Sequence, residues 1–324
     1  MDSHGRSSTD SSLMHRKPRI AFIVARLMRV PFLIMIAIAL AACNPDAQES
    51  RRLRVACDAG DAEACNQFAL RLLVGEYALQ DEARAAELFR ETCNSGISSG
   101  CLELGRMYHD GTSVDADTAR ASALYQQACD GGEMEGCSRL GVLFRAGEGV
   151  PADLARAAVL LQRACDGGDL LGCSHMGSLY ATGQGVTQDL VRAVTLLDRA
   201  CDADIAVGCL ELARLHATGS GVAQDDARAA VLFEKACDGA DSAGCFHLGE
   251  LYASGQGVAN DFSRAASLYR RACNDRHAEA CYELGMLHQN GAGVPRQPSR
   301  AAAFFSRSCE LGYQPACAAE SSST

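Results

Sequence analysis

The stretch CDGGDLLGC, residues 165–173, holds two cysteines eight positions apart around an acidic, glycine-bearing segment. In a continuous α-helix, residues eight apart are separated by about 12 Å along the axis. A disulfide needs Cα atoms about 4.4–6.8 Å apart, so a bonded pair requires the chain to reverse direction. The segment DGGD offers a glycine that can end one helix and an aspartate that can cap the next. We therefore predict a tight turn between a helix ending at Cys165 and a helix beginning near Cys173.

The same cysteine pair recurs eight times, and the interval of 36 residues never deviates. A fixed period in this range indicates stacked supersecondary units. The eight Cys-x7-Cys pairs are Cys57 and Cys65, Cys93 and Cys101, Cys129 and Cys137, Cys165 and Cys173, Cys201 and Cys209, Cys237 and Cys245, Cys273 and Cys281, and Cys309 and Cys317.

Taken alone, such a pair fits three roles: a disulfide, small buried apolar side chains, or metal ligands. Zinc sites usually place cysteines two to four residues apart, so a spacing of eight fits a metal poorly. The compartment decides between the other two roles, because disulfides persist in exported proteins and are rare in the cytosol.

The beginning of the chain has the pattern of an export signal. Basic residues precede thirteen mostly apolar residues, VPFLIMIAIALAA, from Val30 to Ala42. This run is too short for a membrane span, which needs about 20 residues, but it fits a signal-peptide core. It ends in LAAC, which closely resembles the lipobox of bacterial lipoproteins. The resemblance implies cleavage before Cys43, with residues 1–42 as a lipoprotein signal peptide and residues 43–50 as a lipidated linker.

Cys43 is the one cysteine of seventeen that lies outside the eight pairs. An unpaired cysteine in an exported protein needs an explanation, and lipidation provides one. We therefore predict a protein of the bacterial cell envelope whose membrane attachment is the lipid on Cys43. Because Asn44 follows in place of aspartate, the lipobox resemblance favours the outer membrane, facing the periplasm. An ordinary secretory signal is the alternative, and the long basic region leaves Met14 or Met28 open as the start.

Export favours disulfides in all eight pairs, and the residues between the pairs show helical periodicity. Apolar or small residues follow one helix face from Cys173 to Tyr180, and the sequence TGQGV then interrupts the helix. Asp189 can cap a second helix with an apolar face that ends at Cys201. Each unit is therefore predicted to consist of two antiparallel helices.

Glycine positions add detail to this prediction. Because glycine inside a helix costs about 1 kcal/mol, its recurrence four residues after the second cysteine predicts close contact between helices. These glycines are Gly105, Gly141, Gly177, Gly249 and Gly285. In the turns between paired cysteines, Asp204, Ala240 and Arg276 replace the glycine found at Gly168, so we expect those turns to differ in shape.

These features closely resemble the Sel1-like repeat family, which is related to the tetratricopeptide repeat, over residues 51–319. Within that family, the Cys-x7-Cys pairs resemble those of the Helicobacter cysteine-rich proteins. The resemblance implies an all-α fold, a right-handed α-solenoid of seven helix-turn-helix repeats. It also implies that each disulfide joins the second helix of one unit to the first helix of the next. Residues 320–324 are predicted to form a disordered tail.

The sequence offers little for catalysis. The resemblance implies β-lactamase or penicillin-binding activity, but neither Lys17 nor Lys235 follows a serine by three residues, and the Lys-Thr-Gly and Ser-Asp-Asn motifs are absent. A lone Gly-x-Ser-x-Gly, Gly96–Gly100, falls in a predicted turn between paired cysteines and not between a strand and a helix. We predict no catalytic residue, no metal and no cofactor. A weak activity on β-lactams is kept as the alternative function.

The favoured function is a scaffold for protein or peptide partners. Without residues 1–42, the chain carries 24 Lys and Arg against 38 Asp and Glu, which argues against nucleic acid as a partner. Solenoids present a long binding face, commonly on the first helix of each unit. The second and fifth positions after the second cysteine are the least constrained by packing there, and we expect them to be solvated. These candidate residues are Glu103, Arg106, Arg139, His175, Ser178, Glu211, Arg214, His247, Glu250, Glu283 and Met286.

Overall fold

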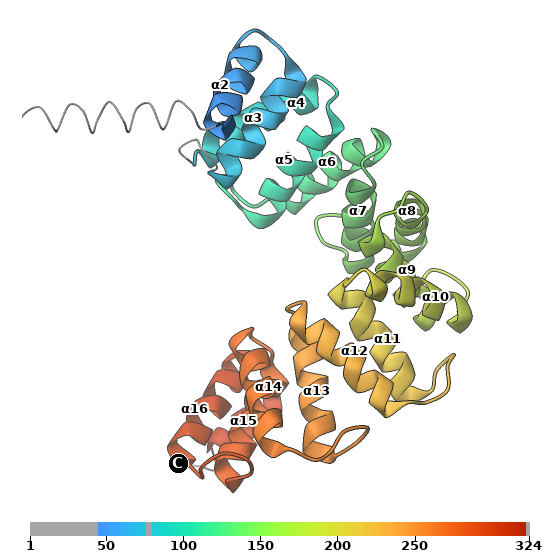
Figure 1. Ribbon diagram of the computed structural model, residues 1–324, viewed down its shortest axis with the longest axis vertical. Coiled ribbons are helices and arrows are strands. Elements are labelled where there is room, and N and C mark those ends of the chain that lie inside the picture. The colour runs from blue at the N-terminus through green and yellow to red at the C-terminus, as the bar shows by residue number, and fades with distance from the viewer. Residues whose placement is uncertain (1–44, 76–79, 322–324) are drawn as a thin grey trace, which may run out of the picture. The chain divides into compact units, whose positions relative to one another are not determined.

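The computed structural model describes residues 45–75 and 80–321, so the predicted signal peptide and Cys43 lie outside the described residues. All regular structure in the described residues is α-helical, and short turns connect the helices (Figure 1). The helices are α2 (Pro45–Asp58), α3 (Ala62–Val74), α4 (Glu82–Asn94), α5 (Ser98–Asp110), α6 (Thr118–Asp130), α7 (Met134–Ala146), α8 (Leu154–Asp166), α9 (Leu170–Thr182), α10 (Leu190–Asp202), α11 (Ala206–Thr218), α12 (Asp226–Asp238), α13 (Ser242–Ser254), α14 (Phe262–Asn274), α15 (Ala278–Asn290), α16 (Pro298–Glu310) and α17 (Gln314–Ser321).

The chain divides into two compact units, and the boundary lies inside α4, between Ala85 and Ala86. In the first unit, α2 packs against α3, and Arg71 Nη1 donates a hydrogen bond to Ser50 Oγ over 3.2 Å. Residues 45–50, which the sequence predicted to be linker, thus belong to the first helix of this unit.

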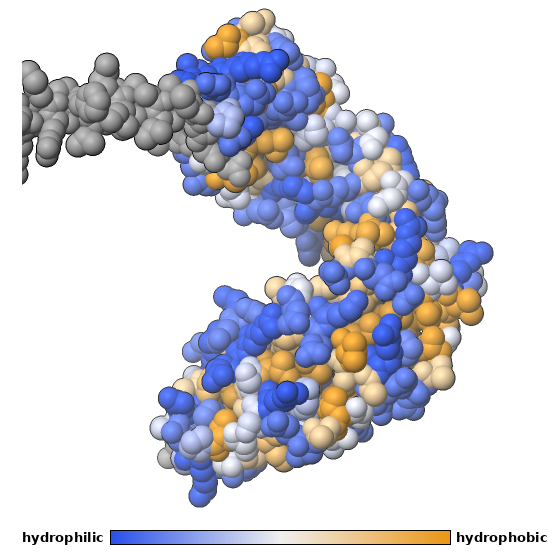
Figure 2. All heavy atoms as spheres, in the orientation of Figure 1, coloured by the Kyte–Doolittle hydropathy of each residue, from blue (hydrophilic) through white to orange (hydrophobic). Residues whose placement is uncertain are grey.

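In the second unit, each helix from α5 to α17 packs against the next one along the chain, as in an α-solenoid. The first helices of successive repeats also contact one another, because α9 contacts both α7 and α11, and α11 contacts α13. The last helix, α17, continues to Ser321, so part of the predicted disordered tail is helical. Hydrophilic side chains cover most of the visible surface, with smaller apolar areas between them (Figure 2).

The turn at residues 165–173 confirms the reversal predicted from the sequence. Helix α8 ends at Asp166, and α9 begins at Leu170, three residues before Cys173. The Asp169 carboxylate caps α9 by accepting a hydrogen bond from the Gly172 N–H over 3.0 Å. The disulfide between Cys165 and Cys173 therefore joins two helices that meet at a tight turn, with Cα atoms 4.4 Å apart.

All eight predicted disulfides are present, each linking cysteines eight residues apart with Cα–Cα distances of 4.4–4.8 Å. From the third pair to the seventh, both cysteines of each pair are at most 2% exposed. Closing a loop of about nine residues is worth about 2–3 kcal/mol in the chain-entropy model. The disulfides thus clamp the second helix of each repeat to the first helix of the next.

The turns that lack glycine keep the same shape, which corrects the expectation from the sequence. Ala240 has φ of 64°, and its N–H donates to the Cys237 carbonyl over 3.0 Å. Gly168 makes the equivalent hydrogen bond to Cys165, also over 3.0 Å. Asp204 and Arg276 likewise adopt positive φ. The fixed spacing of the disulfide and the helix caps holds these residues in the left-handed region that normally favours glycine.

Two kinds of glycine permit close packing. A Cβ atom on Gly177 would lie 2.8 Å from Leu197 Cγ, which confirms the predicted contact between the two helices of a repeat. In five repeats the two helices are joined by a turn of the pattern Gly-x-Gly-Val, at residues 147–150, 183–186, 219–222, 255–258 and 291–294. The second glycine of each turn packs against the preceding repeat. A Cβ on Gly257 would lie 2.6 Å from the backbone nitrogen of Ala227, in the first turn of α12, and closer still to the Asp226 carbonyl.

Candidate functional site

The predicted binding residues lie on α5, α7, α9, α11, α13 and α15, the first helices of six repeats. We call the set formed by the second and fifth positions after the second cysteine the first-helix face. These positions follow the buried cysteine on each helix and alternate with the leucines and glycines that form the core. The first-helix face is therefore carried by elements that disulfides and core packing hold in place.

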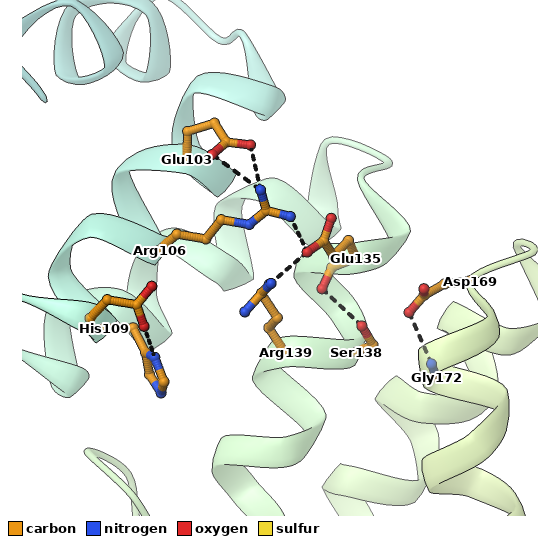
Figure 3. Close-up of polar contacts among 9 residues, drawn as sticks. Glu103, Arg106, His109, Glu135, Ser138, Arg139, Asp169 and Gly172 are labelled. Atoms are coloured by element: carbon orange, nitrogen blue, oxygen red, sulfur yellow. Dashed lines mark hydrogen bonds and ion pairs between the residues drawn. The ribbon is translucent and has the colours of Figure 1, made fainter. Parts of the chain in front are cut away.

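Four charged side chains on α5 and α7 form what we call the arginine cluster: Glu103, Arg106, Glu135 and Arg139 (Figure 3). Arg106 Nη1 donates to both carboxylate oxygens of Glu103, over 3.0 and 3.2 Å, and its Nη2 pairs with Glu135. Arg139 Nε donates to the same Glu135 oxygen over 2.7 Å. The cluster thus connects the first helices of the second and third repeats.

Partial burial and hydrogen bonding shift the pKa values of the two carboxylates of the cluster, Glu103 and Glu135, in opposite directions. Burial raises the pKa of Glu103 above its ordinary value, although the charge of Arg106 opposes this effect. Burial would also raise the pKa of Glu135, but the hydrogen bonds from Arg106 and Arg139 outweigh it and lower that pKa. Both arginine side chains remain about one-third exposed, at 32% and 31%, so a ligand can reach them.

A second connection between repeats joins α11 to α13. Arg214 Nη1 pairs with Glu211 over 2.9 Å, and its Nη2 lies 3.3 Å from His247 Nε2. His247 Nδ1 lies 2.8 Å from a Glu250 carboxylate oxygen. Four of the predicted residues therefore form one polar chain across two neighbouring repeats.

The last part of the first-helix face is acidic and has aromatic neighbours. Burial raises the pKa of Glu283 on α15, and the charge of Glu250 on α13 raises it further. Beside these carboxylates, the Phe246 ring stacks on His277 with centroids 4.6 Å apart. The face thus changes character along its length, from arginine-rich in the second and third repeats to acidic in the sixth and seventh.

His175 departs from the expectation of a solvated surface. It is only 8% exposed, its Nδ1 is buried without a hydrogen bond in the described part of the chain, and burial lowers its pKa to about 4. The charge of Arg145 on α7 acts in the same direction. His175 is therefore part of the packing between first helices. Ser178 and Met286 are half-buried.

The serine of the Gly-x-Ser-x-Gly stretch, Ser98, is the first residue of α5. Its hydroxyl donates to the Gly131 carbonyl over 3.3 Å, so its contact is with the next turn between paired cysteines. Within residues 45–75 and 80–321, no group of three or more His, Cys, Asp or Glu side chains is placed to hold a metal ion. None of the helices described there is both long and apolar enough to cross a membrane.

Glu135 is the residue of the arginine cluster that the sequence analysis missed. It lies two residues before the second cysteine of its repeat, outside the positions chosen for the first-helix face. Its spacing of four residues from Arg139, typical of an ion pair on one helix, was the available signal. Its pairing with Arg106 has no such local signal, because the two residues belong to different repeats.

With this geometry in place, the chain can be compared with known proteins. The family model of the Sel1 repeat matches residues 62–97, 98–133, 135–169, 171–205, 206–241, 242–277 and 278–313. The chain belongs to the Sel1 repeat family. Proteins of this family generally act as scaffolds for protein–protein interaction. No curated protein matches the chain.

Several solved structures are similar to this chain. One is a protective antigen of uropathogenic Escherichia coli strains, 27% identical with a TM-score of 0.63; the match covers 82% of this chain and 57% of that one. The chain thus spans little more than half of that antigen's length. A Sel1 repeat protein from Oxalobacter formigenes is 22% identical with a TM-score of 0.64, covering 85% of this chain and 82% of that one. Cysteine rich protein B of Helicobacter pylori is 30% identical, with a TM-score of 0.34, over 40% of this chain and 94% of that one.

Proposed function

We propose that this protein is an exported, lipid-anchored scaffold that binds a protein or peptide partner in the cell envelope through its first-helix face. The observation that carries the proposal is the row of polar side chains on consecutive first helices. The three arginine side chains remain partly exposed, at 32% for Arg106, 31% for Arg139 and 45% for Arg214. Each of them also forms an ion pair or hydrogen bond with a carboxylate or a histidine in the same region. Charged groups held in place on rigid helices lose little conformational entropy when a partner binds.

Two further observations support export and anchoring. Eight disulfides are expected only where the compartment is oxidising. The sequence LAAC, residues 40–43, provides the proposed lipid attachment at Cys43, outside the described residues. We propose the outer membrane, on its periplasmic side, as the location.

Site-specific photocrosslinking in cells tests the binding face. A photoreactive p-benzoylphenylalanine is placed at Ser178, on the first-helix face, and in a matched control at Val159 on α8, which is 70% exposed. The scaffold proposal predicts a discrete crosslinked envelope protein or peptide with the probe at Ser178 and none at Val159. Crosslinks of equal yield at both positions, or none at Ser178, would overturn it.

A further inference from the structure

The boundary between the sixth and seventh repeats brings two carboxylates together. Glu250 on α13 and Glu283 on α15 take the fifth and second positions after the second cysteine of their repeats. One repeat earlier, the same two positions hold Arg214 and His247, whose side-chain nitrogens lie 3.3 Å apart. Glu250 and Glu283 therefore occupy positions that meet across a repeat boundary. Burial raises the pKa of Glu283, and the charge of Glu250 raises it further.

No cation balances these carboxylates, whereas arginines balance the glutamates at the two boundaries described above. Glu283 has neither a hydrogen bond nor an ion pair with any residue in the described part of the chain. Glu250 pairs with His247 over 2.8 Å. A Glu279 carboxylate oxygen lies 3.3 Å from His277 Nδ1, but burial lowers the pKa of His277, so this ring supplies little positive charge at pH 7. The boundary thus lacks a cation that its carboxylates would hold.

Tyr269 on α14 is a second, independent indication of a ligand. It is 2% exposed, and its hydroxyl makes no hydrogen bond with any described residue. Burial raises the pKa of this hydroxyl, and the charges of Glu283 and Glu250 raise it further, so the hydroxyl faces the same carboxylates. Phe233 and Phe305 fill the equivalent position in the neighbouring repeats, so packing does not require the hydroxyl. Since buried hydroxyls usually have a partner, this one indicates a ligand group beside the two carboxylates.

Aromatic rings next to the carboxylates favour an organic cation. Phe246 and Tyr282 both directly follow the second cysteine of their repeats, on α13 and α15. The ring centroids of Phe246 and Tyr269 lie 5.9 Å apart, and those of Tyr282 and Tyr313 lie 5.3 Å apart. Aromatic faces attract ammonium and guanidinium groups within about 6 Å. Because the Glu250 side chain is 49% exposed, such a group reaches it at the surface, without entering a cavity.

We infer that Glu250 and Glu283, together with the Tyr269 hydroxyl, bind a lysine or arginine side chain of the partner. This inference deepens the proposed function and rests on it, because it gives the chemistry of the partner at the sixth and seventh repeats. Carboxylates and a phenol oxygen accept hydrogen bonds, whereas ammonium and guanidinium groups only donate them. After residue 42 the chain has 38 acidic against 24 basic residues, which also attracts a basic segment.

Four synthetic hexapeptides with blocked ends and the same Gly-Ser body test this inference. Each contains one lysine, arginine, acetyl-lysine or citrulline, so that each basic peptide has a neutral counterpart of similar shape. Binding to the full disulfide-bonded chain is followed at pH 7 by the backbone amide NMR signals of α13 and α15. We expect saturable binding of the lysine or arginine peptide, about fivefold or more tighter than its neutral counterpart. Equal binding of charged and neutral peptides, or tighter binding of Ca²⁺ alone, would overturn the inference.

Substitutions connect this binding to the named acceptors. Glu283→Gln should weaken binding of the basic peptide about fivefold, and Tyr269→Phe about twofold to threefold, because each removes one acceptor. The matched control is Glu234→Gln, which removes an exposed carboxylate of α12 and should change affinity by less than about twofold because solvent and salt screen it.

A loss in Glu234→Gln equal to that in Glu283→Gln would mean unspecific attraction to an acidic chain and would contradict the assignment. The Ser178 photocrosslink separates this inference from the proposed function. If that crosslink forms while charged and neutral peptides bind equally, the scaffold stands and this inference fails. If the basic peptides bind selectively and no Ser178 crosslink forms, the cation site stands and the scaffold proposal fails.

Discussion

The paired glycines of one Gly-x-Gly-Val turn provide a quantitative test of how successive repeats pack. Gly255 and Gly257 have nearly the same backbone conformation, with φ of 75° and 68°. Their surroundings differ, because a Cβ on Gly255 would meet Asn260 Cβ at an ordinary distance of 3.4 Å. A Cβ on Gly257 would overlap the backbone of α12 in the preceding repeat, which cannot rotate away.

The expected effects follow from this difference. An alanine in the left-handed region costs about 1–2 kcal/mol, and this cost applies to both substitutions. Gly257→Ala adds overpacking against rigid backbone, typically about 1–3 kcal/mol. We therefore expect Gly255→Ala to lower the free energy of unfolding by about 1–2 kcal/mol and Gly257→Ala by about 2–5 kcal/mol.

Urea unfolding of the disulfide-bonded chain, followed by circular dichroism at 222 nm, measures both values from the midpoint and slope of the transition. The Gly255→Ala variant is the matched control, since it changes the same turn by the same atoms. Equal destabilisation by the two substitutions would refute the reasoning, because it would mean that Gly257 does not contact the preceding repeat.

Three further outcomes are expected. Under mild reduction with dithiothreitol, the half-buried disulfide Cys309–Cys317 should be reduced and alkylated before the buried disulfide Cys165–Cys173, as measured by mass spectrometry of the alkylated peptides. The opposite order would contradict the control of access by burial. Because the folded pKa of His175 is about 4 and its unfolded pKa about 6.5, the unfolded state binds more protons between these values and stability falls on acidification across that window. In urea titrations at pH 7 and pH 4, His175→Leu should reduce the decrease in the free energy of unfolding on acidification by up to about 3 kcal/mol. An unchanged pH dependence would contradict the burial of His175. Arg276→Gly should raise the free energy of unfolding by about 1 kcal/mol because Arg276 has φ of 66°, and a lower urea midpoint would contradict that conformation.

Much of the fold could be predicted from the sequence because its determinants are local. The cysteine spacing required a chain reversal, and Asp169 caps the helix that follows the reversal. The glycine at position 177 indicated a close helix contact, and it lies against Leu197 of the same repeat. Each of these features involves residues within about 20 positions of one another, where helical geometry alone limits the alternatives.

Contacts between repeats were not predictable in the same way. The pairing of Arg106 with Glu135, the burial of His175 and the packing of Gly257 all depend on how one repeat lies against its neighbour. A periodic pattern shows that units stack, but it leaves the rotation of each unit against the next undetermined. For this reason the sequence predicted which helices carry the candidate residues, but it did not predict the groups that partner their charges.

The turn at Ala240 shows a further limit. Sequence preference alone suggested that a turn without glycine would differ, since alanine disfavours positive φ. The disulfide between Cys237 and Cys245 and the Asp241 cap, however, fix both ends of that turn. Tertiary constraint thus overrides a local preference of about 1–2 kcal/mol.

The most direct test of this account is peptide mass spectrometry of the non-reduced protein purified from the cell envelope. The account predicts that each of the sixteen repeat cysteines is bonded to the one eight residues away, from Cys57 with Cys65 to Cys309 with Cys317. Free thiols at these positions, or bonds between cysteines of distant repeats, would contradict it.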